Sequence, residues 1–196
     1  GDKVVVNADG TISVVATVTT TPSLLQTLDN PNPYGSSDQD QFGSTVSVSG
    51  NYAIVGAQHE DDAGGTSSGK AYIYNATSGA LLHTLDNPNA HGTSASDYFG
   101  KSVAIDGNNA IVGAFGESDA SGNYSGKAYI YNVTSGALLQ TLDNPNSYGT
   151  SENDYFGASV AISGNYAIVT APNEFDAAGD WSGKAYIYNV TSGALL

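Results

Sequence analysis

The heptapeptide GKAYIYN at residues 69–75 occurs three times in this chain, and its copies start at Gly69, Gly126 and Gly183. A second phrase, LLQTLDNPN at residues 24–32, returns from position 81 with His83 in place of Gln, and again from position 138 without change. Both phrases recur at a constant interval of 57 residues, from position 24 to 81 and from 81 to 138. A fixed period of this length is the signature of a repeat protein, in which stacked units build the fold.

Each copy contains four segments with the character of short β-strands. In the first copy these are residues 44–49, 52–57, 70–75 and 80–85. The first two are joined by Gly50-Asn51, a residue pair suited to a tight hairpin turn. The second segment, YAIVGA, is nearly all apolar, which indicates a strand covered on both faces.

The third segment of each copy alternates in side-chain direction. In the first copy Ala71 and Ile73 fall on one face, whereas Tyr72 and Tyr74 fall on the other. A single sheet leaves part of its apolar surface uncovered, so neighbouring sheets are expected to stack. With no helical periodicity anywhere in the repeat, the pattern predicts an all-β fold of tandem four-stranded antiparallel blades of a β-propeller, here an incomplete excerpt of a longer array.

Two sets of apolar residues are predicted to hold the blades together. A Phe before a Gly is expected to anchor each copy, at Phe42, Phe99 and Phe156. The contacts between blades are expected to come from apolar residues of the second and third strands, namely Ile54, Val55, Ile73, Ile111, Val112, Ile130, Ile168, Val169 and Ile187.

Residues 97–105 (DYFGKSVAI) and 110–114 (AIVGA) resemble the FG-GAP repeat. The resemblance recurs in all three copies and covers about residues 24–196, although the third copy has Thr170 where the motif has Gly. The family builds the propeller heads of integrin α subunits and occurs in many bacterial surface proteins. The resemblance therefore implies propeller blades in an extracellular location, on a cell surface or a virion.

Integrin-type repeats of this family carry a calcium loop between their first two strands. Here that connection is reduced to the short turns at residues 49–51, 106–108 and 163–165. The family's calcium site is therefore not carried over to this chain. The copies resemble the short-hairpin variant of the repeat found in bacterial and bacteriophage reading frames.

The two ends of the chain do not fit complete copies. Residues 1–23 are predicted to form an N-terminal β cap or stalk, with strands at residues 3–7 and 11–18. Three blades do not close a ring, so either the array continues or strands from a neighbour or from the N-terminus complete it. An open blade edge is a natural place for another chain to add a strand. The predicted copies are residues 24–80, 81–137 and 138–194, with a fourth starting at Leu195.

Composition excludes several classes of partner. The formal net charge is −14, and all five basic residues are lysines. Because phosphate binding needs clustered Lys and Arg, nucleic acids and anionic membrane surfaces are excluded as partners. The sequence has no Cys and no apolar run long enough to cross a bilayer, so neither a disulfide framework nor membrane insertion is predicted.

Acidic, Gly/Ser-rich loops follow the second strand of each copy. Two carboxylates per loop, helped by loop carbonyls and water, could bind Ca²⁺, which prefers several oxygen ligands. The alternative is that these carboxylates only cap backbone N–H groups of the turn. Calcium is the one cofactor that the sequence leaves open. The candidate ligands are Glu60, Asp62, Glu117, Asp119, Glu174 and Asp176.

The carboxylates near the Phe-Gly pairs do not indicate catalysis. Asp40, Asp97 and Asp154 recur identically, as do Asp29, Asp86 and Asp143, whereas a glycosidase needs two carboxylates in different environments. Turn capping is the favoured interpretation. The three histidines, His59, His83 and His91, share no repeat position and form no recognisable Ser-His-Asp pattern, so the protein is predicted not to be an enzyme.

Aromatic residues in the loops are the candidates for ligand binding. Tyr124 and Trp181 hold the same position in successive copies, and Tyr34 and Tyr148 lie in the long connections between blades. Such residues beside Asn and Asp suit a sugar ring or a protein partner, or else they pack on the adjacent blade.

The sequence thus predicts a non-enzymatic extracellular or virion-surface protein, acting as a fibre element, a spacer or a multivalent binding module. Its expected partners are a protein or glycan ligand on a surface, or copies of itself. The alternatives are a calcium-stabilised, integrin-like ligand-binding propeller and a glycan-active enzyme built on a propeller.

Overall fold

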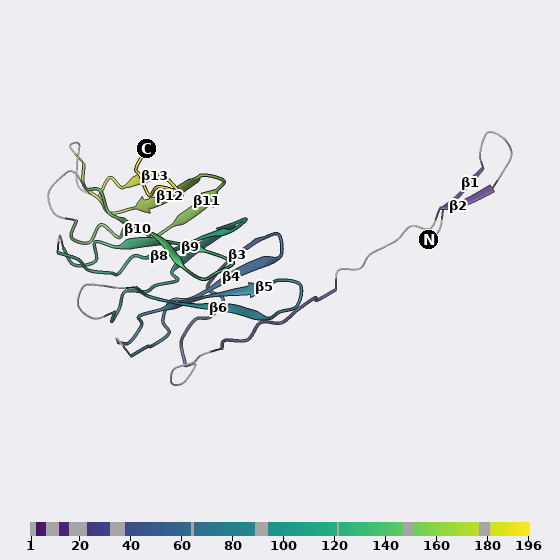
Figure 1. Ribbon diagram of the computed structural model, residues 1–196, viewed down its shortest axis with the longest axis horizontal. Coiled ribbons are helices and arrows are strands. Elements are labelled where there is room, and N and C mark those ends of the chain that lie inside the picture. Colours follow the sequence, from purple (N-terminus) through teal and green to yellow (C-terminus); the bar gives the residue numbers. More distant parts are fainter. Residues whose placement is uncertain are drawn as a thin grey trace.

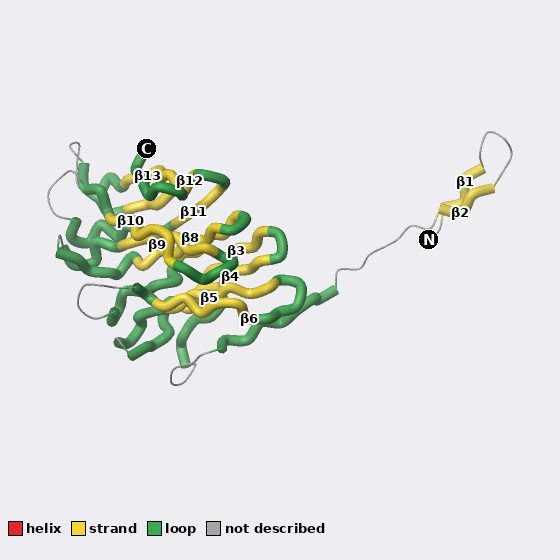
Figure 2. The backbone as a smooth tube through the Cα atoms, in the orientation of Figure 1, coloured by secondary structure: helices red, strands yellow, loops and turns green. Residues whose placement is uncertain are grey.

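The computed structural model contains four antiparallel sheets and, among the described residues, no helix (Figures 1 and 2). None of the described residues therefore belongs to a helix that could cross a membrane. The structure describes residues 3–6, 12–15, 23–31, 38–63, 65–88, 94–120, 122–146, 151–176 and 181–196.

The strands fall into one hairpin and three larger sheets. The hairpin consists of β1 (Lys3–Val6) and β2 (Ile12–Val15), which matches the pair of strands expected near the N-terminus. The first sheet contains β3 (Thr45–Ser49), β4 (Tyr52–Ala57), β5 (Lys70–Asn75) and β6 (Leu81–Asp86). The second contains β7 (Ser102–Asp106), β8 (Asn109–Ala114), β9 (Lys127–Asn132) and β10 (Leu138–Asp143). The third contains β11 (Val160–Ser163), β12 (Tyr166–Ala171) and β13 (Lys184–Asn189).

Each sheet is a meander in which consecutive strands pair antiparallel. In the first sheet the predicted strands agree with the observed ones to within a residue, and β4 and β5 have the predicted bounds. In the first sheet Ile54 lies opposite Ile73, and Val55 lies opposite Tyr72. The register shifts next to Tyr74, where β5 meets β6, and the second sheet has the same irregularity between β9 and β10. The prediction of an all-β array of blade-like units is confirmed.

The three sheets follow one another in chain order and bury their faces against each other (Figure 1). Ile54 and Ile73 of the first sheet lie in one buried cluster with Val103, Ile105 and Tyr131 of the second. In the same way Ile111 and Ile130 of the second sheet lie in a cluster with residues of the third, among them Ala167, Val169 and Tyr188. Removing this apolar surface from water is what stabilises one blade against the next.

One part of the predicted core is not buried. Ile168 and Ile187 correspond to the fully buried Ile111 and Ile130, yet they are 38% and 47% exposed. The expectation that they pack between blades is wrong for this chain, because no further sheet follows the third one among the described residues. The third sheet therefore presents an open apolar face.

The Phe of each Phe-Gly pair packs on the tyrosines of its own blade. The ring of Phe99 lies 5.8 Å from that of Tyr129 and 6.2 Å from that of Tyr131, and Phe156 repeats this geometry. Both phenylalanines are fully buried, as predicted for an anchor. Phe42 makes the same contacts but is only half-buried, and among the described residues no blade-like sheet precedes its own.

The Gly after each Phe brings its carbonyl close to the preceding blade. A Cβ atom added at Gly56 would lie 2.1 Å from the carbonyl oxygen of Gly100, and one at Gly113 would lie 2.0 Å from that of Gly157. Only Gly fits at such a crossing. Thr170 occupies this position in the third copy, where no Phe-Gly turn follows among the described residues.

We expect the substitution Phe99→Ala to lower the free energy of unfolding by about 3–5 kcal/mol, because it leaves a cavity between two blades. Urea denaturation followed by circular dichroism would measure this. Phe175→Ala, which removes an exposed loop ring, is the matched control and should change the value by less than about 0.5 kcal/mol. Similar losses for the two variants would contradict the anchoring role.

Candidate ligand-binding site

The acidic loops place one carboxylate of each pair in the core. Glu60, Glu117 and Glu174 are fully buried. Each accepts a hydrogen bond from a tyrosine hydroxyl on the third strand of its own blade, at 2.6 Å from Tyr72 to Glu60, 2.6 Å from Tyr129 to Glu117 and 2.5 Å from Tyr186 to Glu174. The backbone of the same residues is also fixed, since the Glu60 carbonyl accepts a hydrogen bond from the Gly69 N–H at 2.9 Å.

Burial changes the proton affinity of two of these glutamates. Loss of solvent raises the pKa of Glu60 to about 7, and it raises the pKa of Glu117 to about 7 as well. The tyrosine hydroxyl opposes the shift in both cases, because it stabilises the ionised form, but the effect of burial is larger. The described atoms offer no hydrogen-bond partner to Oε1 of Glu117.

The second carboxylate of each loop lies nearer the surface. Asp62 Oδ1 accepts hydrogen bonds from the Gly65 N–H at 3.0 Å and from the Ser94 hydroxyl at 3.2 Å, and Asp119 accepts one from the Gly122 N–H. These contacts close the turn in the manner of an Asx cap. Asp176, in the third copy, is half-buried.

Lysine ammonium groups lie beside these carboxylates. Lys127 Nζ lies 3.8 Å from Asp119 Oδ2 and is paired with Asp143, while Lys70 is paired with Asp86. Among the residues that the structure describes, no group of three or more His, Asp or Glu side chains is arranged to hold a metal ion. The calcium assignment stays a prediction from the sequence. It requires that a chelator lowers the melting temperature and that added Ca²⁺ restores it.

The buried glutamates make stability depend on pH. Between about pH 4.5 and 7 the folded chain holds protons on Glu60 and Glu117 that the unfolded chain releases, so the free energy of unfolding falls as the pH rises through this window. We expect Glu117→Gln, which keeps an acceptor for Tyr129, to stabilise the fold at pH 8 by about 2–3 kcal/mol relative to its effect at pH 4.5. Denaturant titrations at the two pH values measure the difference.

The control for this experiment is Glu152→Gln, which removes a carboxylate from an exposed position. It should leave the pH dependence of unfolding as it is in the unsubstituted chain. A Glu117→Gln variant with an unchanged pH profile would show that Glu117 is ionised in the fold.

The aspartates before the Phe-Gly pairs make hydrogen bonds that hold the connections between blades. Asp40, Asp97 and Asp154 are buried, and each accepts a hydrogen bond from an Asn amide ten residues earlier, at 2.7–2.8 Å. Burial raises the pKa of Asp40 and of Asp154. The amides come from Asn30, Asn87 and Asn144, and the Asn146 amide also donates to Asp154, at 2.7 Å.

Two of the three histidines have contacts that the structure describes. His83 Nε2 lies 3.1 Å from the carbonyl oxygen of Thr134, where Gln26 and Gln140 make the equivalent contact with the next blade. His59 Nδ1 lies 3.3 Å from the Ser67 hydroxyl. His91 lies outside the described residues.

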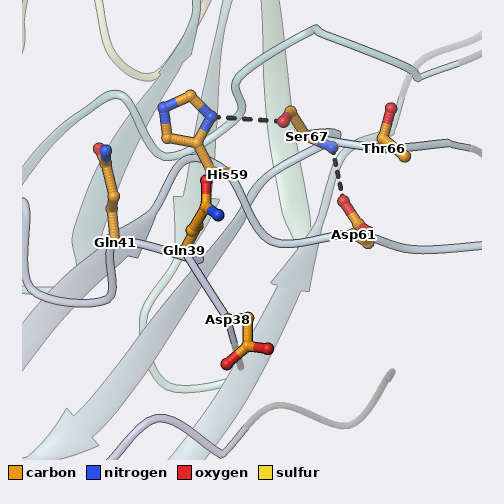
Figure 3. A pocket seen from close by; sticks show the side chains of 7 residues that line it. All are labelled: Asp38, Gln39, Gln41, His59, Asp61, Thr66 and Ser67. Carbon is orange, nitrogen blue, oxygen red and sulfur yellow. Dashed lines mark hydrogen bonds between the residues drawn. The ribbon is translucent and has the colours of Figure 1, made fainter. Parts of the chain in front are cut away.

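His59 and Ser67 line a polar pocket of about 340 Å³ (Figure 3). Asp61 accepts a hydrogen bond there, but from the backbone N–H of Ser67 at 2.8 Å and not from the imidazole (Figure 3). A catalytic triad needs the carboxylate on the histidine, where it orients the ring. This pocket therefore lacks the arrangement of a serine hydrolase. Its lining residues are Asp38, Gln39, Gln41, His59, Asp61, Thr66 and Ser67.

A second hollow, which we call the aromatic cleft, has a different character. It measures about 430 Å³ and lies beside the loops of all three copies. Residues from the Phe-Gly turns, from the ends of the second strands and from one acidic loop line it. They are Gln58, His59, Tyr98, Lys101, Phe115, Tyr124 and Tyr155.

The rings of the aromatic cleft form a continuous chain. Tyr98 stacks on Phe115, with ring centroids 5.1 Å apart and planes 13° from parallel. Phe115 meets the edge of Tyr155 at 5.5 Å, and Tyr155 meets Tyr124 at 6.2 Å. At the other end His59 meets Tyr98 edge to face at 5.2 Å. Aromatic contacts of this kind fix each ring and leave its outer surface for a ligand.

The backbone holds these rings in an unusual conformation. Tyr98, Tyr124 and Tyr155 have φ angles of 54°, 53° and 58°, in the left-handed region that residues with a side chain seldom adopt. The equivalent residues Gln41, Ser67 and Trp181 have φ angles of 58°, 53° and 54°, so this conformation belongs to the turns of every copy. In the cleft it is accompanied by hydrogen bonds between copies, from the N–H of Tyr98 to the carbonyl of Ser67 and from that of Tyr155 to the carbonyl of Tyr124, both at 3.2 Å.

The positions that line the cleft differ between the three copies, whereas the core positions are nearly constant. Position 98 is Tyr, and its equivalents are Gln41 and Tyr155. Position 115 is Phe, with Gln58 and Pro172 as equivalents. The combination of Tyr98, Phe115 and Tyr155 therefore occurs once among the described residues, where the second copy meets the third.

The structure places the residues that were predicted to bind a ligand in different surroundings. Tyr124 lies in the aromatic cleft and is 39% exposed. Trp181 is largely exposed in the third blade and is not among the residues of this cleft. Tyr34 and Tyr148 lie outside the described residues. Sequence reasoning missed Tyr98, Phe115 and Tyr155 as ligand candidates, because they come together only when the copies stack.

Stacked antiparallel sheets of three or four strands, repeated in tandem, define this molecule as a propeller-like repeat protein whose ring is not closed within the described residues. The family model of the FG-GAP repeat matches residues 33–74, 89–131 and 148–188. This chain therefore belongs to the FG-GAP repeat family. Repeats of this family typically form binding or structural modules and are typical of extracellular proteins.

Solved structures show the same architecture. Of the 184 matching chains, one is the crystal structure of the computationally designed Ika4 protein. The similarity has a TM-score of 0.52 at 15% sequence identity, and it covers 90% of this chain and 78% of that chain. At this level of identity the likeness concerns the fold alone. A comparison with curated proteins finds no match.

Proposed function

We propose that this chain is a non-enzymatic, extracellular binding module of a cell surface or a virion, and that it holds a sugar ring in the aromatic cleft. The observation that carries the proposal is the chain of rings from Tyr98 through Phe115 to Tyr155. Sugar rings present C–H groups on one face, and aromatic rings with fixed orientation are well suited to stack on them.

Polar groups beside the rings supply hydrogen bonds for the sugar hydroxyls. Gln58, His59 and Lys101 line the same cleft. The ammonium of Lys101 lies 6.0 Å from the centre of the Phe115 ring and takes part in none of the ion pairs found among the described residues. A cation in this position, on a chain of net charge −14, favours a sugar that carries a carboxylate.

A rigid array suits this role. The blades are joined by continuous apolar clusters and by hydrogen bonds between copies, so the cleft is held in a fixed shape. Preformed sites lose little conformational entropy on binding. Where many such chains stand on one surface, weak binding by each chain adds up to a stronger attachment.

The test is a glycan array followed by calorimetry with the best neutral and uronic acid-containing oligosaccharides. We expect Phe115→Ala to weaken binding about tenfold to thirtyfold, since it removes the central ring of the chain. Lys101→Ala should weaken binding of the acidic oligosaccharide and leave that of the neutral one unchanged. Phe175→Ala, an exposed loop ring outside the cleft, is the control.

Two results would count against the proposal. One is the absence of binding to any glycan on an array that includes acidic and neutral sugars. The other is binding that Phe115→Ala leaves intact while the variant keeps the melting temperature of the parent chain.

A further inference from the structure

The polar pocket of Figure 3 and the aromatic cleft are two parts of one continuous surface. His59 lines both hollows, with Nδ1 3.3 Å from the Ser67 hydroxyl on one side and its ring 5.2 Å from that of Tyr98 on the other. The amide of Gln58, which lines the cleft, donates a hydrogen bond to the side chain of Gln41, which lines the pocket. A molecule that occupies one hollow therefore borders directly on the other.

The two hollows are also built from equivalent positions of neighbouring copies. Gln41 of the polar pocket corresponds to Tyr98 of the aromatic cleft, 57 residues later, and Ser67 corresponds in the same way to Tyr124. All four residues have φ angles between 53° and 58°, so the backbone of the turns is the same. The loops of successive copies thus place ligand positions in a row along the stack, on the face that repeat proteins often use for binding.

The side chains at these positions differ in chemistry between the two copies. The cleft presents aromatic rings and the ammonium of Lys101. The pocket presents side-chain amides, hydroxyls and the carboxylates of Asp38 and Asp61, and His59 is the one ring among the described residues that line it. Amides, hydroxyls and carboxylates are suited to hydrogen bonds with sugar hydroxyls. The pocket therefore suits a further stretch of a sugar chain that the rings of the cleft hold by stacking.

The charge of the polar pocket excludes an acidic sugar. Neither Asp38 nor Asp61 belongs to an ion pair among the described residues, and Asp61 accepts the Ser67 backbone N–H at 2.8 Å. Burial raises the pKa of Asp40, and the negative charges of Asp61 and Asp38 raise it further. A sugar carboxylate beside these groups would be repelled in the same way, and repulsion of the wrong ligand is a common source of specificity.

From the continuity of the two hollows and their different charge, we propose that the ligand is an oligosaccharide in which acidic sugars stand apart among neutral ones. Its acidic sugar lies in the aromatic cleft beside Lys101, and a neutral stretch of the same chain lies in the polar pocket beside Asp38 and Asp61. This inference rests on the proposed function and adds the length and the charge pattern of the ligand. A polymer of uronic acids does not fit, because it brings further carboxylates into the pocket.

Calorimetry with the full chain and two pairs of probes tests the inference. One pair consists of xylose chains of two and of six units, each with a single glucuronic acid branch near its middle. The other pair consists of galacturonic acid oligomers of two and of six units. We expect the longer xylose probe to bind at least about tenfold more tightly than the shorter one, because it extends into the polar pocket. The same extension of the galacturonic acid probe should bring less than about a twofold gain.

A double variant measures the contribution of the polar pocket. Gln39→Ala together with Thr66→Ala removes two exposed hydrogen-bonding groups from its lining. We expect this variant to reduce the gain from the longer xylose probe to about twofold. Asn153→Ala is the matched control, because Asn153 occupies the position of Gln39 in the third copy and lines neither hollow. It should leave the gain as it is in the parent chain.

A second double variant tests the charge pattern. Asp38→Asn together with Asp61→Asn removes both carboxylates, and the amide at position 61 keeps an acceptor for the Ser67 N–H. Because the repulsion is lost, the longer galacturonic acid probe should now bind at least about threefold more tightly than the shorter one.

The results distinguish this inference from the proposed function. A shorter xylose probe that binds, with no gain from the longer one, would overturn the inference alone. So would equal gains in the xylose and galacturonic acid pairs, or a full gain in the Gln39→Ala, Thr66→Ala variant. Failure of all four probes to bind would overturn it as well, and failure of every glycan on the array would overturn the proposed function itself.

Discussion

The stacking of one small sheet on the next is the constraint on which the structure depends. No single blade buries both of its faces, and the Phe-Gly turn is the device that brings the following blade close enough to do so. Its carbonyl crosses directly over Gly56 and Gly113, which leaves no room for a side chain at either position. The aromatic anchor, the glycine crossing and the apolar clusters are therefore parts of one interaction. A change in any of them alters the packing of two blades.

This constraint divides the repeat into positions where the residue must be the same in every copy and positions where it can vary. Strand positions face another copy on both sides and must be nearly the same in every unit, as Ile54 and Ile111 illustrate. Loop positions at one end of the sheets face solvent, so they can differ from copy to copy without loosening the stack. At these loop positions Tyr98, Phe115 and Tyr155 lie side by side. Within a single copy, none of the loops that carry them indicates this contact.

Much of the fold could be predicted from the sequence, because strand alternation and the period of 57 residues are local properties. The aromatic cleft could not, since its rings meet only through the stacking of different copies. The position of Glu60 was equally hidden, because an acid in a Gly/Ser-rich loop suggests solvent. Its partner, the Tyr72 hydroxyl, lies twelve residues away on a strand whose alternation says nothing of this hydrogen bond. The exposure of Ile187 was also missed, since the pattern within a copy does not show whether another sheet covers it.

The contacts that join the copies have one more property, which concerns the gene. Each links positions at a constant offset along the chain, such as 45 residues between Tyr74 and Asp29, and between Tyr131 and Asp86. Unequal recombination that duplicates or deletes one whole unit therefore leaves every contact in register, and only the number of junctions changes. A duplication of part of a unit would misalign the contacts that span the insertion. Arrays of this type can thus change length in whole units over evolution without a folding penalty at the point of insertion.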